Sequence, residues 1–140
     1  MTITCTVCIG FDTAKRLRGF TGPCANLHGY HHMAEFRFAS LGKTGNIVMD
    51  FAEIERILGG WVRENWDHNL ILNKQDKPLG EAVRKITGQK IFYLETDPSA
   101  EALAEYLLKT CCPKLFKKYK VQCVSVRLYD TPDCWVEASL

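Results

Sequence analysis

Hydrophobic and polar residues alternate in two stretches near the start of the chain and in two near its end. Thr2–Phe11 is rich in β-branched residues, and Tyr30–Phe38 carries apolar or aromatic residues at alternate positions. Val121–Tyr129 alternates in the same way, and Cys134–Ser139 follows a turn at Pro132-Asp133. A period of two is typical of a strand with one buried face, so these stretches predict four strands.

Two stretches with helical periodicity lie between the two pairs of strands. Apolar residues recur at helical spacing over residues 51–64, after Asp50 as an N-cap and with Glu53 three positions later. A second helix is predicted to start at Asp97-Pro98, with Asp97 as its N-cap, and its apolar stripe runs to Leu115. Each helix therefore has one face suited to packing on a sheet.

The remaining segments carry turn-forming and polar residues. Lys15–Asn26 contains glycines and a proline and predicts a loop, and Gly42–Asn46 predicts a turn. Lys74–Gly88 is polar and predicts a loop or a short turn of helix, whereas Gln89–Leu94 is a candidate short strand.

The resulting order is β-β-α-α-β-β. Strands grouped apart from helices favour an α+β domain over residues 1–140, with an antiparallel four-stranded sheet and two helices on one face. Such a sheet has two unpaired edges. We therefore expect subunits to pair edge to edge in a homo-oligomer.

Composition and charge exclude several classes of protein. The chain is 46% hydrophobic and 24% charged, and its 18 basic and 16 acidic residues leave a net charge of +2. No nucleic-acid partner is expected, because the basic residues 114, 117, 118 and 120 suit a solvated helix end. No apolar run approaches the ~18 residues of a membrane span, and no signal-peptide pattern is present. We expect a cytoplasmic protein without a membrane partner.

The seven cysteines do not predict a disulfide framework. Their number is odd, and no secretion signal accompanies them. Cys5 and Cys8 have the spacing of half a zinc knuckle or a redox pair, but they lie in an alternating strand, which favours packing. Cys111 and Cys112 lie on the second helix, and we interpret them as packing residues as well.

One run of residues combines a thiol with several imidazoles. Cys24 lies in a Gly/Pro-flanked loop four residues before His28, where a thiolate could act as a nucleophile or base. His28, Tyr30 and His32 share one strand face, and His31 faces the other side. Imidazoles on one face can converge on zinc. The other interpretation is a free cysteine and surface histidines.

Two shorter runs are also candidates for chemistry. Asp67 precedes His68 directly, and a carboxylate beside an imidazole can orient it for proton transfer, although a surface pair is the alternative. Asp130, which Thr131 follows, ends a strand and could accept two hydrogen bonds from a 2-amino-N–H ring edge. Its alternative role is a turn cap before Pro132.

Taken together, six runs resemble the 6-pyruvoyl/6-carboxy-tetrahydropterin synthase family in order and spacing. Phe11–Leu17 is similar to FSAAHRL, Cys24–Gly29 to C-x-x-x-H-G-H, Gly45–Phe51 to G-x-V-x-D-F, Trp66–Asn73 to LDH-x-x-LN, Asp97–Ala104 to PT-x-EN-x-A, and Val124–Thr131 to V-x-V-x-E-T. The resemblance implies the T-fold (tunnelling fold), in which trimers pair face to face. It also implies a dihydroneopterin triphosphate substrate bound at a subunit boundary.

The resemblance also implies roles for individual residues. It assigns proton transfer to Cys24, Asp67 and His68. It assigns substrate binding to Asp130, Thr131 and Tyr30, with an Asp in place of the family's longer Glu. The three residues between the Cys and the next His favour the 6-carboxy branch, which feeds 7-deazapurine (queuosine) biosynthesis.

The family's zinc site is altered in this sequence. The resemblance places its three histidine ligands at Lys15, His28 and Tyr30, and one imidazole cannot hold a tetrahedral zinc tightly. The Lys15 ammonium could replace the metal charge, or its amine could form a Schiff base. Alternatively His32, or with poorer geometry His31, rebuilds a zinc site. In a third explanation the protein binds a ring compound without chemistry.

We therefore expect a lyase similar to 6-carboxy-5,6,7,8-tetrahydropterin synthase that acts on 7,8-dihydroneopterin triphosphate or a related pterin without zinc. Its catalytic residues would be Cys24, Asp67, His68 and Lys15. No cofactor is expected unless the zinc site is rebuilt. The alternative is a non-catalytic homologue that binds a pterin or a purine.

Overall fold

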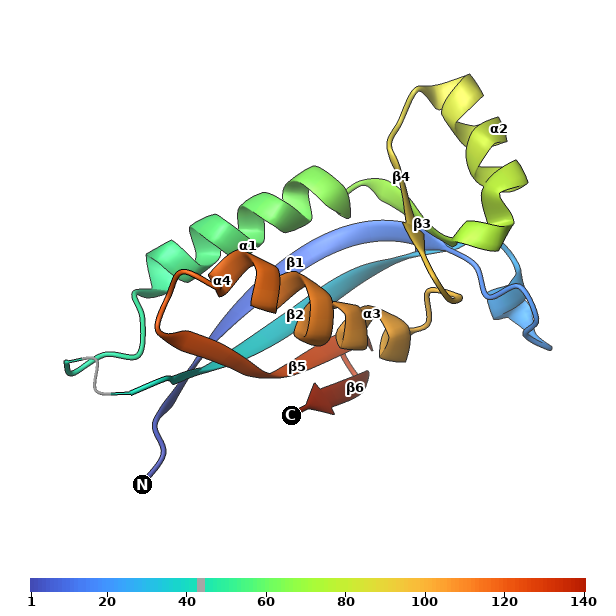
Figure 1. Cartoon of the computed structure of the whole chain (residues 1–140). Coiled ribbons are helices and arrows are strands. Elements are labelled where there is room, and N and C mark those ends of the chain that lie inside the picture. The colour runs from blue at the N-terminus through green and yellow to red at the C-terminus, as the bar shows by residue number, and fades with distance from the viewer. Residues whose placement is uncertain (43–44) are drawn as a thin grey trace.

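The computed structural model describes residues 1–42 and 45–140, so the turn predicted over Gly42–Asn46 lies partly outside the described residues. One curved sheet runs through the molecule (Figure 1). Its six strands have the order β4-β3-β1-β2-β5-β6. The strands are β1 (Thr4–Lys15), β2 (His28–Ser40), β3 (Asn69–Asn73), β4 (Ile91–Leu94), β5 (Val121–Thr131) and β6 (Cys134–Ser139).

The helices lie mainly over one face of this sheet. They are α1 (Phe51–Asn65), α2 (Lys77–Thr87), α3 (Ala100–Tyr106), a π-helical turn (Leu107–Cys111) and α4 (Cys112–Phe116). In Figure 1, α1, α3 and α4 cover the central strands, whereas α2 stands beyond β3 and β4. Among the described residues, no helix has the length and apolar character that a membrane crossing requires.

The predicted α+β class is confirmed, but the sheet has six strands instead of four. β3 pairs with β1 in parallel, and β4 pairs with β3 in parallel, so the sheet is mixed. The inner residues of β3, Leu70, Ile71 and Leu72, are all buried. A strand that is covered on both faces shows an apolar run instead of alternation, and for this reason the period-two pattern missed β3.

The structure differs from the prediction in two further places, the end of β1 and the segment before β4. β1 continues to Lys15 instead of ending at Phe11, because Thr13 and Lys15 occupy buried positions that sequence patterns reserve for apolar residues. The segment Lys74–Gly88, predicted as a loop or a short turn of helix, contains the 11-residue helix α2, which has a proline in its first turn and is capped by Gly88 with a left-handed φ of 73°.

The start of α3 also differs from the prediction. The N-cap is Ser99, whose side chain accepts a hydrogen bond from the Ala102 backbone N–H at 3.2 Å. Asp97 is therefore not the cap. Its carboxylate instead accepts the Arg18 backbone N–H at 3.0 Å and the Asn73 side-chain amide at 3.0 Å, and it connects the loop after β1 to the end of β3. The predicted Asp50 cap of α1 is confirmed.

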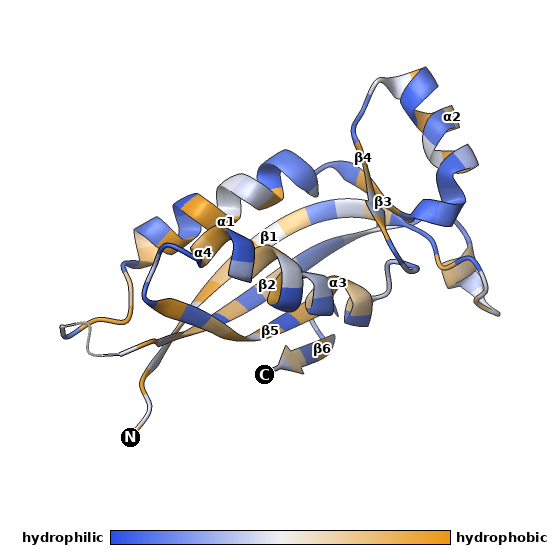
Figure 2. Ribbon diagram, viewed as in Figure 1, coloured by the Kyte–Doolittle hydropathy of each residue, from blue (hydrophilic) through white to orange (hydrophobic). Residues whose placement is uncertain are grey.

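The buried face of the β1–β2 ladder is apolar over most of its length and polar at one end. Over most of their length, alternate residues of both strands pack under the helices, including Ile9, Phe36 and Phe38. Figure 2 shows that the apolar colouring of β1 gives way to polar colouring toward its C-terminal end. There the ladder places Lys15 opposite His28. Polar side chains thus continue the buried face of the sheet.

Candidate functional site

A cavity of about 170 Å³ lies at the polar end of the buried face, where β1, β2, β5 and β6 meet the start of α3. We call it the lysine cavity. Its ionisable side chains are those of Lys15, Cys24, His28, Tyr30, Glu101, Asp130 and Cys134. Five of these seven were sequence candidates. Cys134 was missed, and so was Glu101, although it lies in a run that matches the family pattern.

Lys15 is the most deeply buried charged group of the lysine cavity, with 2% of its surface exposed. Its Nζ donates a hydrogen bond to Asp130 Oδ1 at 3.3 Å and lies 5.5 Å from the centroid of the Tyr30 ring. Burial lowers the pKa of Lys15, and the nearby Asp130 carboxylate opposes that shift without cancelling it. The site therefore holds a poorly hydrated amine with one carboxylate partner.

Asp130 binds a second group that the sequence did not connect to it. It occupies an irregularity of the β5–β6 ladder between Tyr129 and Thr131, and its Oδ1 lies 3.3 Å from His32 Nδ1. Thr131 does not line the lysine cavity. One carboxylate oxygen thus contacts both Lys15 and His32.

His32 is completely buried, and its hydrogen bonds fix its protonation. Its Nδ1 lies 3.0 Å from the Tyr129 carbonyl, which can only accept, so Nδ1 carries the proton. Burial lowers the pKa of His32 to about 4, and the Lys15 charge acts in the same direction. The ring is neutral at pH 7, and its Nε2 is buried without a protein partner.

Cys24 and Tyr30 also line the lysine cavity. Cys24 belongs to a single 3₁₀ turn, Pro23–Ala25, and its carbonyl accepts the Leu17 N–H at 2.8 Å, which joins the two arms of the loop between β1 and β2. Burial raises the pKa of Tyr30, and the adjacent Cys24 and Asp130 add to the shift. The phenol is therefore a proton donor at neutral pH.

A second group of polar residues lies on the other face of the β1–β2 ladder. We call it the Asp–His cluster, and it comprises Asp12, His31, Asp67 and His68. His31 Nδ1 lies 2.8 Å from Asp12 Oδ1, and His68 Nδ1 lies 3.0 Å from Asp67 Oδ1. His68 Nε2 lies 4.0 Å from Asp12 Oδ2, and the His68 side chain is 77% exposed. Both imidazoles thus face carboxylates in contact with solvent.

The turn between α1 and β3 positions Asp67 and His68. Trp66 is fully buried and anchors the turn, and His68 has a left-handed φ of 61°, which is uncommon for residues other than glycine. Two hydrogen bonds to β1 hold this conformation: His68 N–H to the Asp12 carbonyl at 2.7 Å, and Asp12 N–H to Asp67 Oδ1 at 2.9 Å. Partial burial raises the pKa of Asp67, but the hydrogen bonds from the Asp12 N–H and the His68 imidazole, with the charges of His68 and His31, outweigh it and lower the pKa overall.

Within one chain, the structure does not bring all the predicted catalytic residues together. Lys15 and Cys24 line the lysine cavity, but Asp67 and His68 do not. Asp12 and Lys15 are three positions apart on β1, so they face opposite sides of the sheet. A site that uses both groups must be completed by a second subunit.

The residues at the expected zinc positions do not fit a tetrahedral zinc ion. Lys15 directs an ammonium group toward Asp130, and Tyr30 offers a phenol. At these three positions His28 is the one imidazole: its Nδ1 lies 2.6 Å from the Asn26 carbonyl, which leaves its buried, unpartnered Nε2 as the one imidazole nitrogen available to a metal. His32 lies about 13 Å along the strand from His28, at roughly 3.3 Å per residue. In the described part of the chain, the one group of three clustered metal-type donors is Asp12, Asp67 and His68.

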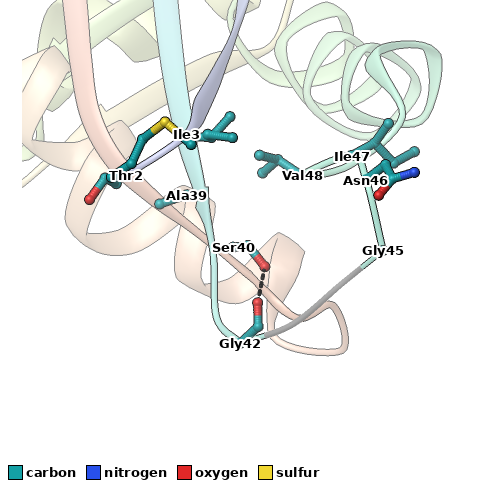
Figure 3. Close-up of a pocket in the computed structure, with 10 residues that line it drawn as sticks. Thr2, Ile3, Ala39, Ser40, Gly42, Gly45, Asn46, Ile47 and Val48 are labelled. Atoms are coloured by element: carbon teal, nitrogen blue, oxygen red, sulfur yellow. Dashed lines mark hydrogen bonds between the residues drawn. The ribbon is translucent and has the colours of Figure 1, made fainter.

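A wider hollow lies at the opposite end of the sheet, near the N-terminus (Figure 3). It has a volume of about 610 Å³, and its walls include Ile3, Ile47 and Val48. Ser40 Oγ donates a hydrogen bond to the Gly42 carbonyl at 2.8 Å on its rim. None of its described lining side chains is ionisable.

Comparison with known proteins identifies the family. The sequence model of the 6-pyruvoyl tetrahydropterin synthase family matches residues 4–139. The chain belongs to this family. A 6-carboxy-5,6,7,8-tetrahydropterin synthase of Rickettsia bellii is 39% identical over 136 residues, which cover 96% of this chain and 99% of the relative. The enzyme of that name in Aquifex aeolicus is 32% identical over 115 residues, 77% of this chain and 70% of the relative.

Solved structures confirm the T-fold for this family member. An uncharacterized protein of Wolinella succinogenes superimposes with a TM-score of 0.81 at 17% identity, covering 99% of this chain and 98% of that one. The 6-pyruvoyl tetrahydropterin synthase of Caenorhabditis elegans gives a TM-score of 0.68 at 17% identity, covering 100% of this chain and 96% of its own.

Proposed function

We propose that this tetrahydropterin synthase family member is a lyase that acts on the side chain of 7,8-dihydroneopterin triphosphate, or of a related pterin, without zinc. The observation that carries the proposal is the buried Lys15 ammonium, 3.3 Å from Asp130, at a position where the family pattern has a histidine ligand. A fixed cation in a site shielded from water stabilises negative charge that develops on a substrate oxygen.

The other cavity residues complete this proposed reaction. Cys24 acts as the base, and Tyr30 donates to the substrate oxygens. Asp130 Oδ1 already contacts Lys15 and His32, so its other oxygen is the one that accepts the 2-amino edge of the pterin. The three-residue interval between Cys24 and His28 and the names of the relatives favour the 6-carboxy reaction and, with it, a role in 7-deazapurine (queuosine) biosynthesis.

The proposed reaction requires an oligomer. His68 is the second proton-transfer group and Asp67 orients it, but this pair lies on the face opposite the lysine cavity in the same chain. We propose that one subunit supplies the lysine cavity and a neighbour supplies Asp67 and His68. The open edges at β4 and β6 are available for such pairing, and a dimer of trimers is the arrangement that the family resemblance implies.

Turnover in the presence of a chelator tests the proposal directly. Protein purified without a metal-affinity tag is analysed for zinc by elemental analysis and then incubated with dihydroneopterin triphosphate in excess EDTA. We expect turnover with less than stoichiometric zinc, and we expect the Lys109→Met variant, altered at an exposed lysine, to behave like the wild type. Activity that disappears with EDTA and returns with zinc would contradict the proposal.

The second candidate function is pterin or purine binding without chemistry. The loss of two of the three expected histidine ligands favours it. In that case Cys24→Ala leaves the ligand affinity nearly unchanged, whereas Asp130→Ala abolishes binding. Calorimetry with a pterin ligand, together with the absence of turnover, distinguishes this function from the lyase.

A further inference from the structure

The residue that disrupts the expected zinc site is itself a nucleophile. We propose that Lys15 forms a Schiff base with an aldehyde or ketone on the side chain of a bound pterin, a carbonyl that dihydroneopterin triphosphate, whose side chain carries hydroxyls, acquires only in the course of the reaction. This inference rests on the proposed function, which identifies the ring that carries the side chain as a pterin. It replaces metal polarisation of a carbonyl by covalent activation, which is a recognised alternative way to make that carbon electrophilic.

The surroundings of Lys15 suit this reaction. Lys15 lines the lysine cavity, although only 3% of its side chain is exposed to bulk water. Asp130 Oδ1, at 3.3 Å, is placed to accept a proton from the ammonium group. The burial that lowers the pKa of Lys15 also increases the fraction of neutral amine, which is the reactive form.

The step balances without any further reagent. The Lys15 ammonium transfers one proton to Asp130, and the freed lone pair on Nζ forms a bond to the carbonyl carbon as the carbonyl π electrons move to oxygen. That oxygen takes one proton from Nζ and one from Asp130 and leaves as water. An ammonium and a carbonyl thus give a protonated imine and one water molecule, and nothing is oxidised or reduced.

The size and walls of the cavity define the class of substrate. A volume of about 170 Å³ corresponds to about five or six water molecules in the liquid, which suits a short side chain. Tyr30 and Trp135 both line the cavity and offer aromatic surfaces to such a ligand. The expected partner of Lys15 in this step is therefore an aldehyde or ketone on a short chain, attached to a flat ring that lies at the cavity mouth.

Reductive trapping tests the inference on the intact protein. The wild-type chain is incubated with 6-formylpterin and sodium cyanoborohydride, and the product is analysed by intact mass and peptide mapping. We expect one stable adduct per chain, located at Lys15, which forms at least about tenfold faster than adducts at exposed lysines. Lys74 and Lys109, with side chains 55% and 62% exposed, are internal comparators in the same digest.

Matched variants separate a reactive amine from a structural one. Lys15→Arg keeps the cation but cannot form an imine, so the specific adduct must disappear; Lys109→Met must leave it unchanged. 6-Hydroxymethylpterin, which lacks the carbonyl, must give no adduct. An adduct spread over surface lysines, or none at Lys15, overturns the inference. Because the position of the adduct is mapped in the wild-type protein, the result does not depend on whether any variant folds.

The outcomes also separate this inference from the proposed function. Turnover of dihydroneopterin triphosphate in EDTA without any adduct at Lys15 leaves the lyase in place and removes the Schiff base, so that Lys15 acts as a fixed cation. A specific adduct at Lys15 without turnover supports the Schiff base and removes that substrate and reaction.

Discussion

The lysine cavity and the Asp–His cluster lie on the two faces of the same β1–β2 ladder, yet they place ionisable groups in opposite environments. In the lysine cavity, Lys15 and His32 are almost completely removed from water, and burial lowers the pKa of both. In the Asp–His cluster, His31 and His68 have side chains 66% and 77% exposed and face carboxylates. Alternate residues of one strand thus acquire different chemistry because helices cover only one face.

The largest effect is expected for the removal of the buried cation. Lys15→Met keeps most of the packing volume but leaves Asp130 without its ammonium partner and the substrate without a cation or an amine. We expect kcat for dihydroneopterin triphosphate to fall by about 10²–10³-fold, the range seen when one electrostatic contact to a transition state is lost. Circular dichroism and the mass of the oligomer check that the variant is folded. A fall in kcat of less than about threefold would show that Lys15 does not stabilise the transition state.

Mixing two inactive variants tests whether the lysine cavity and the Asp–His pair of one active site come from different subunits. We expect Cys24→Ala and His68→Ala to be inactive as separate oligomers. When they are unfolded together and reassembled in equal amounts, about a quarter of the sites combine an intact lysine cavity with an intact Asp–His pair from a neighbour. Activity near a quarter of the wild-type value is therefore expected. If the mixture stays as inactive as its components, the two-subunit site is wrong.

The buried environment of His32 predicts a pH effect on stability. The pKa of His32 is about 4 in the folded chain and near 6.5 when unfolded, so the unfolded state binds more protons between these values. Stability is therefore lost as the pH falls from about 6.5 to 4, by roughly 2–4 kcal/mol from this residue. Urea unfolding of wild type and His32→Phe across this range measures the difference.

The comparison between these two proteins isolates His32 from the other groups that titrate. Lys15, Asp130 and His31 lie close to His32 and remain in the variant. We expect the free energy of unfolding of His32→Phe to depend less steeply on pH than that of the wild type. Parallel curves for the two proteins would show that His32 is not held neutral by burial.

The smallest effect is expected at the N-terminus of α1, far from both regions. Asp50 accepts a hydrogen bond from the Ala52 N–H at 3.0 Å, and Asp50→Ala should destabilise the protein by about 1 kcal/mol, or roughly 3–5 °C in Tm. Because the opposite end of α1 leads to Asp67, kcat tests whether the Asp–His pair depends on the helix. We expect kcat to stay unchanged, since the hydrogen bonds to β1 hold the pair.

The sequence patterns predicted some elements of the fold well and others poorly. The amphipathic helix after Asp50 and the long alternating strands were predicted correctly, because one face of each is buried against the core. β3 was missed because its centre is buried on both sides, and the end of β1 was missed because Lys15 replaces an apolar residue there. In both cases burial by distant elements overrode the local pattern.

The candidate site shows the same division. Spacing and residue type singled out Cys24, Lys15 and Asp130, but not the contact of Asp130 with His32 or the support that Asp12 gives to Asp67. These contacts join residues 98 and 55 positions apart, because they arise from strand pairing. No periodicity along the chain encodes them.

The sequence alone determined the family, the presence of a thiol and an Asp–His pair, and the replacement of expected zinc ligands by an amine and a phenol. These are properties of residue identity and spacing, which do not change on folding. The tertiary structure alone decided that Lys15 and His32 share one carboxylate oxygen and that the Asp–His pair lies on the other face. Burial and strand register set those relations, because both depend on which distant segments the sheet brings together.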